Sequence, residues 1–284
     1  MKGKLVLLAT VGLLGVTQAQ KINVYAAPYI TFIDYEGSGI KKDGWVGTLL
    51  TTLSFDAGKQ VVNLGYAYTH LNYKVPGSWN QNDYTVSYTT YNYYPWILTV
   101  GYHYLTSPGN DFSAKANIPF AYFGYSQRYQ WDLGTFVSYS DYKQGVGAFE
   151  LQPSFGFYRW KDYYTGSYYS INLTWINVKG MKTLQTNKRN YFSVGGSATY
   201  FRIGSYSVKA GAWLGQRMLM VDNGGFVVYN LRERYSFGAD LSGTYYLDKN
   251  LSLTGIVGYS HYKETSTGKK VDVYTFTVSV GYSF

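Results

Sequence analysis

The chain has 284 residues, of which 20% are aromatic and only 14% are charged, with 34 Tyr, 32 Gly and no Cys. A soluble globular protein carries about 25% charged residues, so the composition argues against an ordinary soluble domain. The lack of Cys excludes disulfides, thiolate metal sites and cysteine nucleophiles. The formal net charge of +9 is compatible with nucleic acid or with an anionic membrane surface.

The N-terminal segment has the pattern of a secretory signal peptide. Two lysines precede an apolar run from Leu5 to Val16, and small residues end at Ala19, where cleavage would occur. We therefore expect residues 1–19 to be a signal peptide and residues 20–284 to form one mature domain. Export from the cytosol argues against a nucleic-acid partner, so the basic excess is expected to face lipid head groups or anionic solutes.

The mature chain alternates apolar residues with small polar ones. In residues 46–55 and 61–70 the alternating partners are mostly Gly, Ser, Thr and Asn, on either side of a short link. A period of two over such lengths predicts β-strands joined as a hairpin. Residues 96–104 and 251–260 repeat the pattern. No later stretch approaches the roughly 18 consecutive apolar residues of a membrane-spanning helix.

Fourteen such strands are predicted, near residues 21–36, 45–56, 61–74, 83–92, 96–106, 117–128, 131–142, 146–159, 167–179, 190–203, 205–220, 228–247, 251–264 and 271–284. Their spacing leaves room for about 9 to 11 residues per strand to cross a bilayer. Long polar links tend to alternate with tight turns, and an even count places both chain ends on the side of the tight turns, expected to be periplasmic. Merging strands within 83–106 or 146–179 gives the alternative of twelve.

The two faces of the predicted strands differ in chemistry. One carries small polar residues with few charges, which suits a water-filled interior, and the other is apolar, which suits lipid. Tyr and Trp gather near strand ends, as in the aromatic girdles of membrane barrels. The alternative is that these aromatics pack a soluble β core. The pattern predicts an all-β fold: a transmembrane up-and-down antiparallel β-barrel with a cleaved N-terminal signal peptide.

The last strand has an apolar face that continues to the terminal residue, made of Phe276, Val278, Val280, Tyr282 and Phe284. A closed barrel pairs its last strand with its first, so this terminus is expected to lie in a hydrogen-bonded ladder. The stretch also resembles the C-terminal assembly signal of bacterial outer-membrane proteins. The resemblance implies recognition by the barrel assembly machinery of a Gram-negative outer membrane.

In size the predicted barrel resembles the monomeric fourteen-strand porins. The resemblance implies a monomer that contacts outer-membrane lipids and lets small solutes diffuse passively through its lumen. A structural or adhesive barrel with a plugged lumen is the first alternative, and a lipid-modifying enzyme is the second.

Catalytic signatures are sparse. The three histidines are His70, His103 and His261, and none has a Ser two residues away on the same face of its strand. A hydrolase site needs such a Ser within hydrogen-bond reach of its His, although a partner on a neighbouring strand stays open. No metal-ligand cluster or nucleotide fingerprint is present, so we expect neither catalysis nor a cofactor.

Alternation predicts a pore lining that includes Lys209, Trp213, Arg217, Arg232, Arg234, Asp240, Glu150 and Asp132. The same alternation places Tyr235 on the lipid face. Three arginines opposite carboxylates would set a transverse field and a size limit, which favours anionic or polar solutes. The alternative is that these charges pair with one another and fill a closed lumen.

Overall fold

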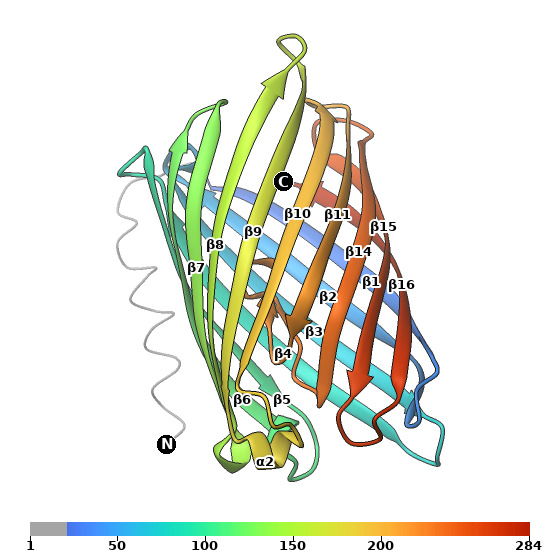
Figure 1. The fold of residues 1–284 in the computed structure, drawn as a ribbon. Helices are drawn as coiled ribbons and strands as arrows, with labels where there is room; N and C mark the ends of the chain where they lie inside the picture. The colour runs from blue at the N-terminus through green and yellow to red at the C-terminus, as the bar shows by residue number, and fades with distance from the viewer. Residues whose placement is uncertain (1–21) are drawn as a thin grey trace.

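The computed structural model describes residues 22–284, and the predicted signal peptide lies outside this range. Fourteen antiparallel strands close into one barrel (Figure 1). In chain order they are β1 Asn23–Glu36, β2 Lys41–Phe55, β3 Gln60–Tyr73, β4 Ser78–Thr90, β5 Trp96–Thr106, β6 Lys115–Gln127, β7 Trp131–Tyr142, β8 Gly147–Trp160, β9 Thr165–Lys179, β10 Asn190–Arg202, β11 Tyr206–Arg217, β14 Glu233–Tyr246, β15 Leu251–Glu264 and β16 Lys270–Ser283. The predicted all-β barrel of fourteen strands is confirmed.

The barrel closes by pairing β1 with β16. Ile30 lies opposite Val278, Phe32 lies opposite Phe276, and the backbone N–H of Phe284 donates to the carbonyl of Val24 at 2.8 Å. The last residue is thus held in the ladder, as the alternation predicted. Closure leaves no wall strand with an unpaired edge.

The two ends of the barrel differ. Both described chain ends and the short links 56–59, 91–95, 128–130, 161–164, 203–205 and 247–250 lie at one end, which we call the termini end. The opposite end, the loop end, carries most of the longer links and the short helix α2 (Met181–Leu184) at the bottom of Figure 1. Among the described residues, no helix is long and apolar enough to cross a bilayer.

Alternation sorts the side chains as expected over most of the wall. On β16 the outward Phe276 and Val278 are 50% and 39% exposed, while the inward Thr277 and Ser279 are buried. The outer face is a nearly continuous apolar surface, which is stable only against lipid or another apolar partner. The inner face is left with small polar groups.

Alternation fails at the loop end of two neighbouring strands. The predicted strands 205–220 and 228–247 are too long, because β11 ends at Arg217 and β14 begins at Glu233. A bulge in β14 between Tyr235 and Phe237 adds one residue relative to β15 and reverses the faces beyond it. The expectation that Tyr235 faces lipid is therefore wrong: its side chain is buried inside the barrel.

Candidate functional site

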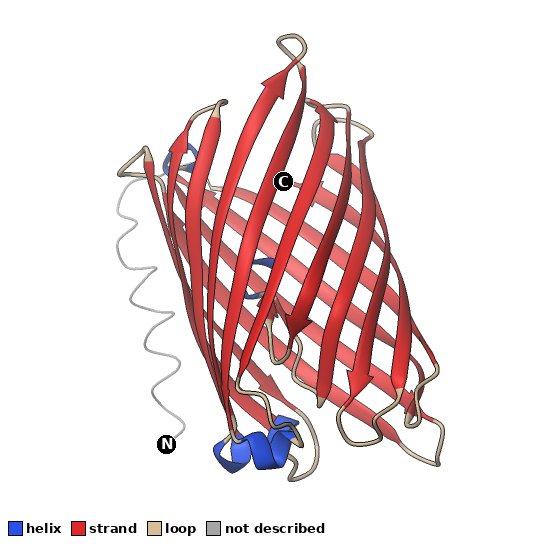
Figure 2. Cartoon of the chain, in the orientation of Figure 1, coloured by secondary structure: helices blue, strands red, loops and turns tan. Residues whose placement is uncertain are grey.

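Residues 218–232, which we call the inner loop, leave the wall at the loop end and fold back into the lumen. They contain the two-residue strands β12 (Val221–Asp222) and β13 (Val227–Val228), joined by the 3-10 turn Asn223–Gly225. Figure 2 shows this turn as the short blue coil in the middle of the barrel. The inner loop therefore decides how much of the lumen stays open.

The first part of the inner loop is an apolar strip. Met218, Leu219, Met220 and Val221 are each at most 1% exposed. They pack on inward side chains of the wall between β5 and β10, including Leu105, Ile118, Phe136, Ile176 and Tyr191. This side of the lumen is filled like the core of a soluble protein.

Three hydrogen bonds fix the inner loop to the wall. The backbone N–H of Val221 donates to Glu150 Oε2 at 2.8 Å. His103 Nδ1 lies 2.9 Å from the carbonyl oxygen of Gly225, and the side chain of Asn230 donates to Gln81 Oε1. These contacts reach β8, β5 and β4 and hold both arms and the tip of the loop.

His103 is also the centre of a buried polar network. Its ring is 1% exposed, and Nε2 lies 2.9 Å from Asp83 Oδ1. Both oxygens of Asp83 accept from the Gln81 amide at 2.8 Å. The carboxylate of Asp83 is therefore engaged by protein donors, which reduces the field that it sends into the lumen.

The tip of the inner loop rests on glycines and an aromatic ring. A Cβ atom at Gly65 of β3 would lie 2.9 Å from the ring of Phe226, so only glycine leaves room for this contact. Gly225 has φ +97° and packs against the ring of Phe120 on β6. The tip thus reaches from β6 across to β3.

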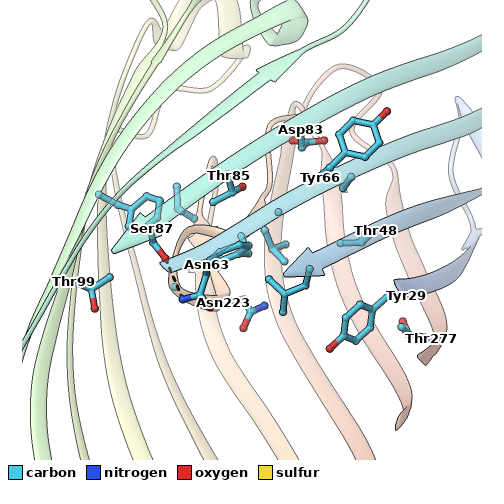
Figure 3. A pocket seen from close by; sticks show the side chains of 18 of the residues that line it. Tyr29, Thr48, Asn63, Tyr66, Asp83, Thr85, Ser87, Thr99, Asn223 and Thr277 are labelled. Atoms are coloured by element: carbon cyan, nitrogen blue, oxygen red, sulfur yellow. Dashed lines mark hydrogen bonds between the residues drawn. The ribbon is translucent and has the colours of Figure 1, made fainter. Parts of the chain in front are cut away.

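Two cavities lie on either side of the inner loop, and residues of β1–β4 and β14–β16 line both of them. One has a volume of about 1020 Å³ and lies toward the termini end, where Tyr29, Asn63 and Thr277 line it (Figure 3). The other has a volume of about 470 Å³ and lies toward the loop end. Both are lined by Thr31, Thr48, Ala67, Asp83, Phe226 and Val227. The two cavities therefore share part of their lining beside the tip of the loop.

Charge is scarce in both cavities. In the larger one Asp83 is the one charged lining residue within the described chain, and the smaller one adds Asp222, Glu233 and Asp240. Neither Lys nor Arg from residues 22–284 lines either space. Ser and Thr hydroxyls supply most of the polar groups of the larger cavity.

The three predicted arginines do not gather in a row. Arg217 is buried, donates from Nε to Ser193 Oγ at 2.7 Å, and has its guanidinium 4.0 Å from the centre of the Trp213 ring. Arg232 pairs with Asp111 at 3.0 Å, at the loop end. Arg234 lies between the buried Glu233 and Tyr235 of β14, so alternation turns it away from the lumen.

The other predicted residues lie on the inner face at different depths. Lys209 is exposed opposite Ser242, and Asp240 is exposed beside Gly211. Glu150 is 1% exposed beneath the inner loop. Asp132 lies near the termini end, where Tyr168 donates to it at 3.0 Å. Within the described residues, no three His, Asp or Glu side chains converge as a metal site requires.

A buried ion pair links β2 and β14 at the loop end of the barrel. Lys41 pairs with Glu233, and the two side chains are 8% and 7% exposed. The Lys41 ammonium also lies 4.8 Å from the centre of the Tyr35 ring. Sequence reasoning missed this pair, the inner loop and the His103 network. The sequence did contain one sign of the inner loop, which was the apolar run 218–221 next to residues that resemble an exposed turn.

No family model and no curated protein matches the sequence. Solved structures do match. The CymD monoaromatic hydrocarbon channel has a TM-score of 0.58 and 8% identity, covering 94% of this chain and 89% of that one. A bacterial polysaccharide outer membrane secretin has a TM-score of 0.57 and 11% identity, covering 93% and 98%.

The toluene transporter TodX of Pseudomonas putida has a TM-score of 0.55 and 7% identity, and the match covers 99% of this chain and 93% of TodX. Identities this low carry no residue-level correspondence, so the likeness concerns architecture. The chain has the fold of the outer-membrane β-barrel channels.

Proposed function

We propose that this protein is an outer-membrane channel through which small polar solutes diffuse passively, with both chain ends in the periplasm. The observation that carries the proposal is that two cavities, one toward each end of the barrel, share lining residues beside Phe226. The proposed route runs along β14–β16 and β1–β4 and bypasses the part of the lumen that residues 218–221 fill. Three structural neighbours, which are named as a channel, a secretin and a transporter, support a transport role.

The lining favours neutral or weakly cationic solutes over anions. The charged groups that line the two cavities are acidic, and Asp83 is engaged by His103 and Gln81. Arg217 is held by Ser193 and Trp213 outside both cavities. A pore wall of low dielectric focuses the potential of the charges that face it, so the acidic groups make the potential in the passage negative.

Single-channel recording in planar bilayers tests the proposal. The wild type is expected to give ohmic steps with reversal potentials that show no anion preference. Replacing residues 222–227 by two glycines removes the tip of the inner loop and should enlarge the steps by about twofold or more, because the narrowest cross-section limits conductance.

A matched control replaces Tyr163 and Tyr164, two exposed residues of the turn 161–164, by glycine and should leave the step size unchanged. Should the wild type give no steps while the shortened loop conducts, the inner loop is a plug and the barrel has a structural role. Steps with a strong anion preference would contradict the proposed lining.

A further inference from the structure

Three inward tyrosines at the termini half of the lumen lie over glycines of the wall. A Cβ atom at Gly134 would collide with the phenol end of Tyr122, and one at Gly156 would collide with that of Tyr168. Gly281 gives the same room to Tyr25. The phenol end of each ring therefore lies against the backbone of a glycine, and Tyr25 and Tyr122 also line the larger cavity.

These tyrosines form clusters with polar groups beside them. Tyr168 donates to Asp132 at 3.0 Å, and its ring centre lies 4.6 Å from that of Tyr158. Asp132 Oδ2 has no hydrogen-bond donor among residues 22–284, and the side chain is half-buried. An oriented carboxylate with a free oxygen therefore lies next to a pair of inward aromatic rings.

The wall between these clusters is uncharged and rich in hydroxyls. Beside Tyr25 and Tyr122, the larger cavity is lined by Ser and Thr from many strands. A hydroxyl both donates and accepts, so it can exchange hydrogen bonds with a solute that carries hydroxyls in any orientation. Asp83, the charged lining residue of this cavity within residues 22–284, is already engaged by His103 and Gln81, so a charged solute gains little from the cavity wall.

We propose that the termini half of the lumen binds neutral carbohydrates, with Tyr122, Tyr168 and Tyr25 stacking on sugar rings and Asp132 accepting from a sugar hydroxyl. Sugar rings present flat C–H surfaces edged by hydroxyls, which match an aromatic face set in a hydroxyl-rich wall. A hydrocarbon would instead strip water from those hydroxyls without replacing its hydrogen bonds. This inference rests on the proposed channel function for the statement that the bound sugar is in transit.

The first experiment measures binding and conduction separately. Calorimetry with purified protein in detergent and a neutral maltooligosaccharide as probe reports binding, and planar-bilayer recording with the same probe reports transient interruptions of the ion current. Polyethylene glycol of equal hydrodynamic size is the control for simple obstruction. We expect saturable calorimetric binding and interruptions with the maltooligosaccharide, and neither with the polymer.

Variants locate the binding. Tyr168→Ala should raise both the dissociation constant and the half-blocking concentration about three- to tenfold, as the loss of one aromatic contact does. Tyr169→Ala removes the neighbouring ring on the outer face and should change neither value. Tyr168→Phe keeps the ring and should retain most of the affinity. Asp132→Asn should weaken binding less than Tyr168→Ala.

The outcomes separate the two proposals. Ion conduction without saccharide binding overturns the carbohydrate site and leaves the channel standing. Binding that depends on Tyr168, in a protein that gives no current steps, supports the site and refutes the channel. Binding that is equal in the wild type and in Tyr168→Ala overturns the assignment to these tyrosines.

Discussion

Toward the loop end, on the side of the lumen formed by β5–β10, the strip 218–221 packs against apolar wall residues and fills the lumen. On the side formed by β1–β4, the inner loop touches the wall through Phe226 on Gly65 and through the bond from Asn230 to Gln81, and cavities lie on either side of the loop tip. One side of the same barrel therefore has the composition of a protein core and the other that of a wet channel. The comparison shows that a single loop can determine the open cross-section of the lumen without a ring of charged residues.

The largest expected effect concerns the buried ion pair between β2 and β14 at the loop end. Lys41→Met leaves the buried carboxylate of Glu233 without its partner and should lower the free energy of unfolding by about 3–5 kcal/mol. Denaturant titration in detergent measures this change. Adding Glu233→Gln to Lys41→Met should recover much of the loss, and a double variant as unstable as Lys41→Met alone would contradict the pairing.

The packed side should respond next. Met220→Ala deletes a fully buried side chain of the apolar strip and should cost about 2–5 kcal/mol through lost burial and a residual cavity. Val227→Ala, at a residue of the same loop that is 42% exposed, is the matched control and should cost well under 1 kcal/mol. Equal costs for the two variants would mean that the strip does not pack as described.

Removing the contact at the loop tip should change the channel more than the fold. His103→Ala breaks the contacts with Gly225 and Asp83, so the tip should move, and the open-channel current noise should rise. The accompanying loss of stability should be about 1–3 kcal/mol, the cost of leaving buried partners unsatisfied. His70→Ala is the control, since His70 bonds Asn80 and Asn72 away from the inner loop. Unchanged noise in His103→Ala would contradict the role of His103 in holding the loop tip.

Substitutions of one arginine and one aspartate test which charged residues face the passage. Arg217→Ser should lower stability by about 1–3 kcal/mol by removing a buried hydrogen bond and a cation–π contact. Its reversal potential should stay near that of the wild type, because Arg217 lines neither cavity. Asp240→Asn should do the opposite and shift the reversal potential away from cations with little loss of stability. A selectivity change with Arg217→Ser that exceeds the Asp240→Asn change would contradict the assigned passage.

The smallest expected effect lies in a turn outside both regions. The carboxylate of Asp248 accepts the backbone N–H groups of Asn250 and Leu251, and these bonds hold its pKa below the usual range of an aspartate. A lowered folded-state pKa stabilises above the unfolded pKa, and the contribution is lost as pH falls through the folded value. The stability difference between wild type and Asp248→Ala should therefore be small at neutral pH and vanish in acid. A difference that grows in acid would contradict this linkage.

Most of the wall could be predicted from alternation alone, because each strand has lipid on one side and small polar groups on the other. The prediction failed where the period breaks. Gly215, with φ +123°, and the bulge after Tyr235 shift the faces of β11 and β14, and a period-two pattern cannot locate such a shift. The position of the inner loop in the lumen depends on contacts with Phe120, Gly65 and His103, which are distant from the loop in sequence.

The lumen residues show the same limit. Asp132 and Glu150 could be placed on an inner face, whereas nothing local says that Glu150 accepts the N–H of Val221 or that Asp132 meets Tyr168. The abundance of tyrosine and glycine was visible in the amino-acid composition. Their pairing depends on strand register, which places Tyr168 over Gly156 of the preceding strand.

The seam between β1 and β16 joins residues that are separated by nearly the whole chain, as in the pairing of Tyr25 with Ser283. Each other pair of neighbouring wall strands can form as soon as its two members exist, but this pair needs the final residues of the polypeptide. Closure is therefore the contact with the greatest sequence separation and the largest loop entropy, which makes it a natural slow step of folding. Until that step, β1 and β16 both expose unpaired backbone groups, so the chain needs protection between synthesis and closure.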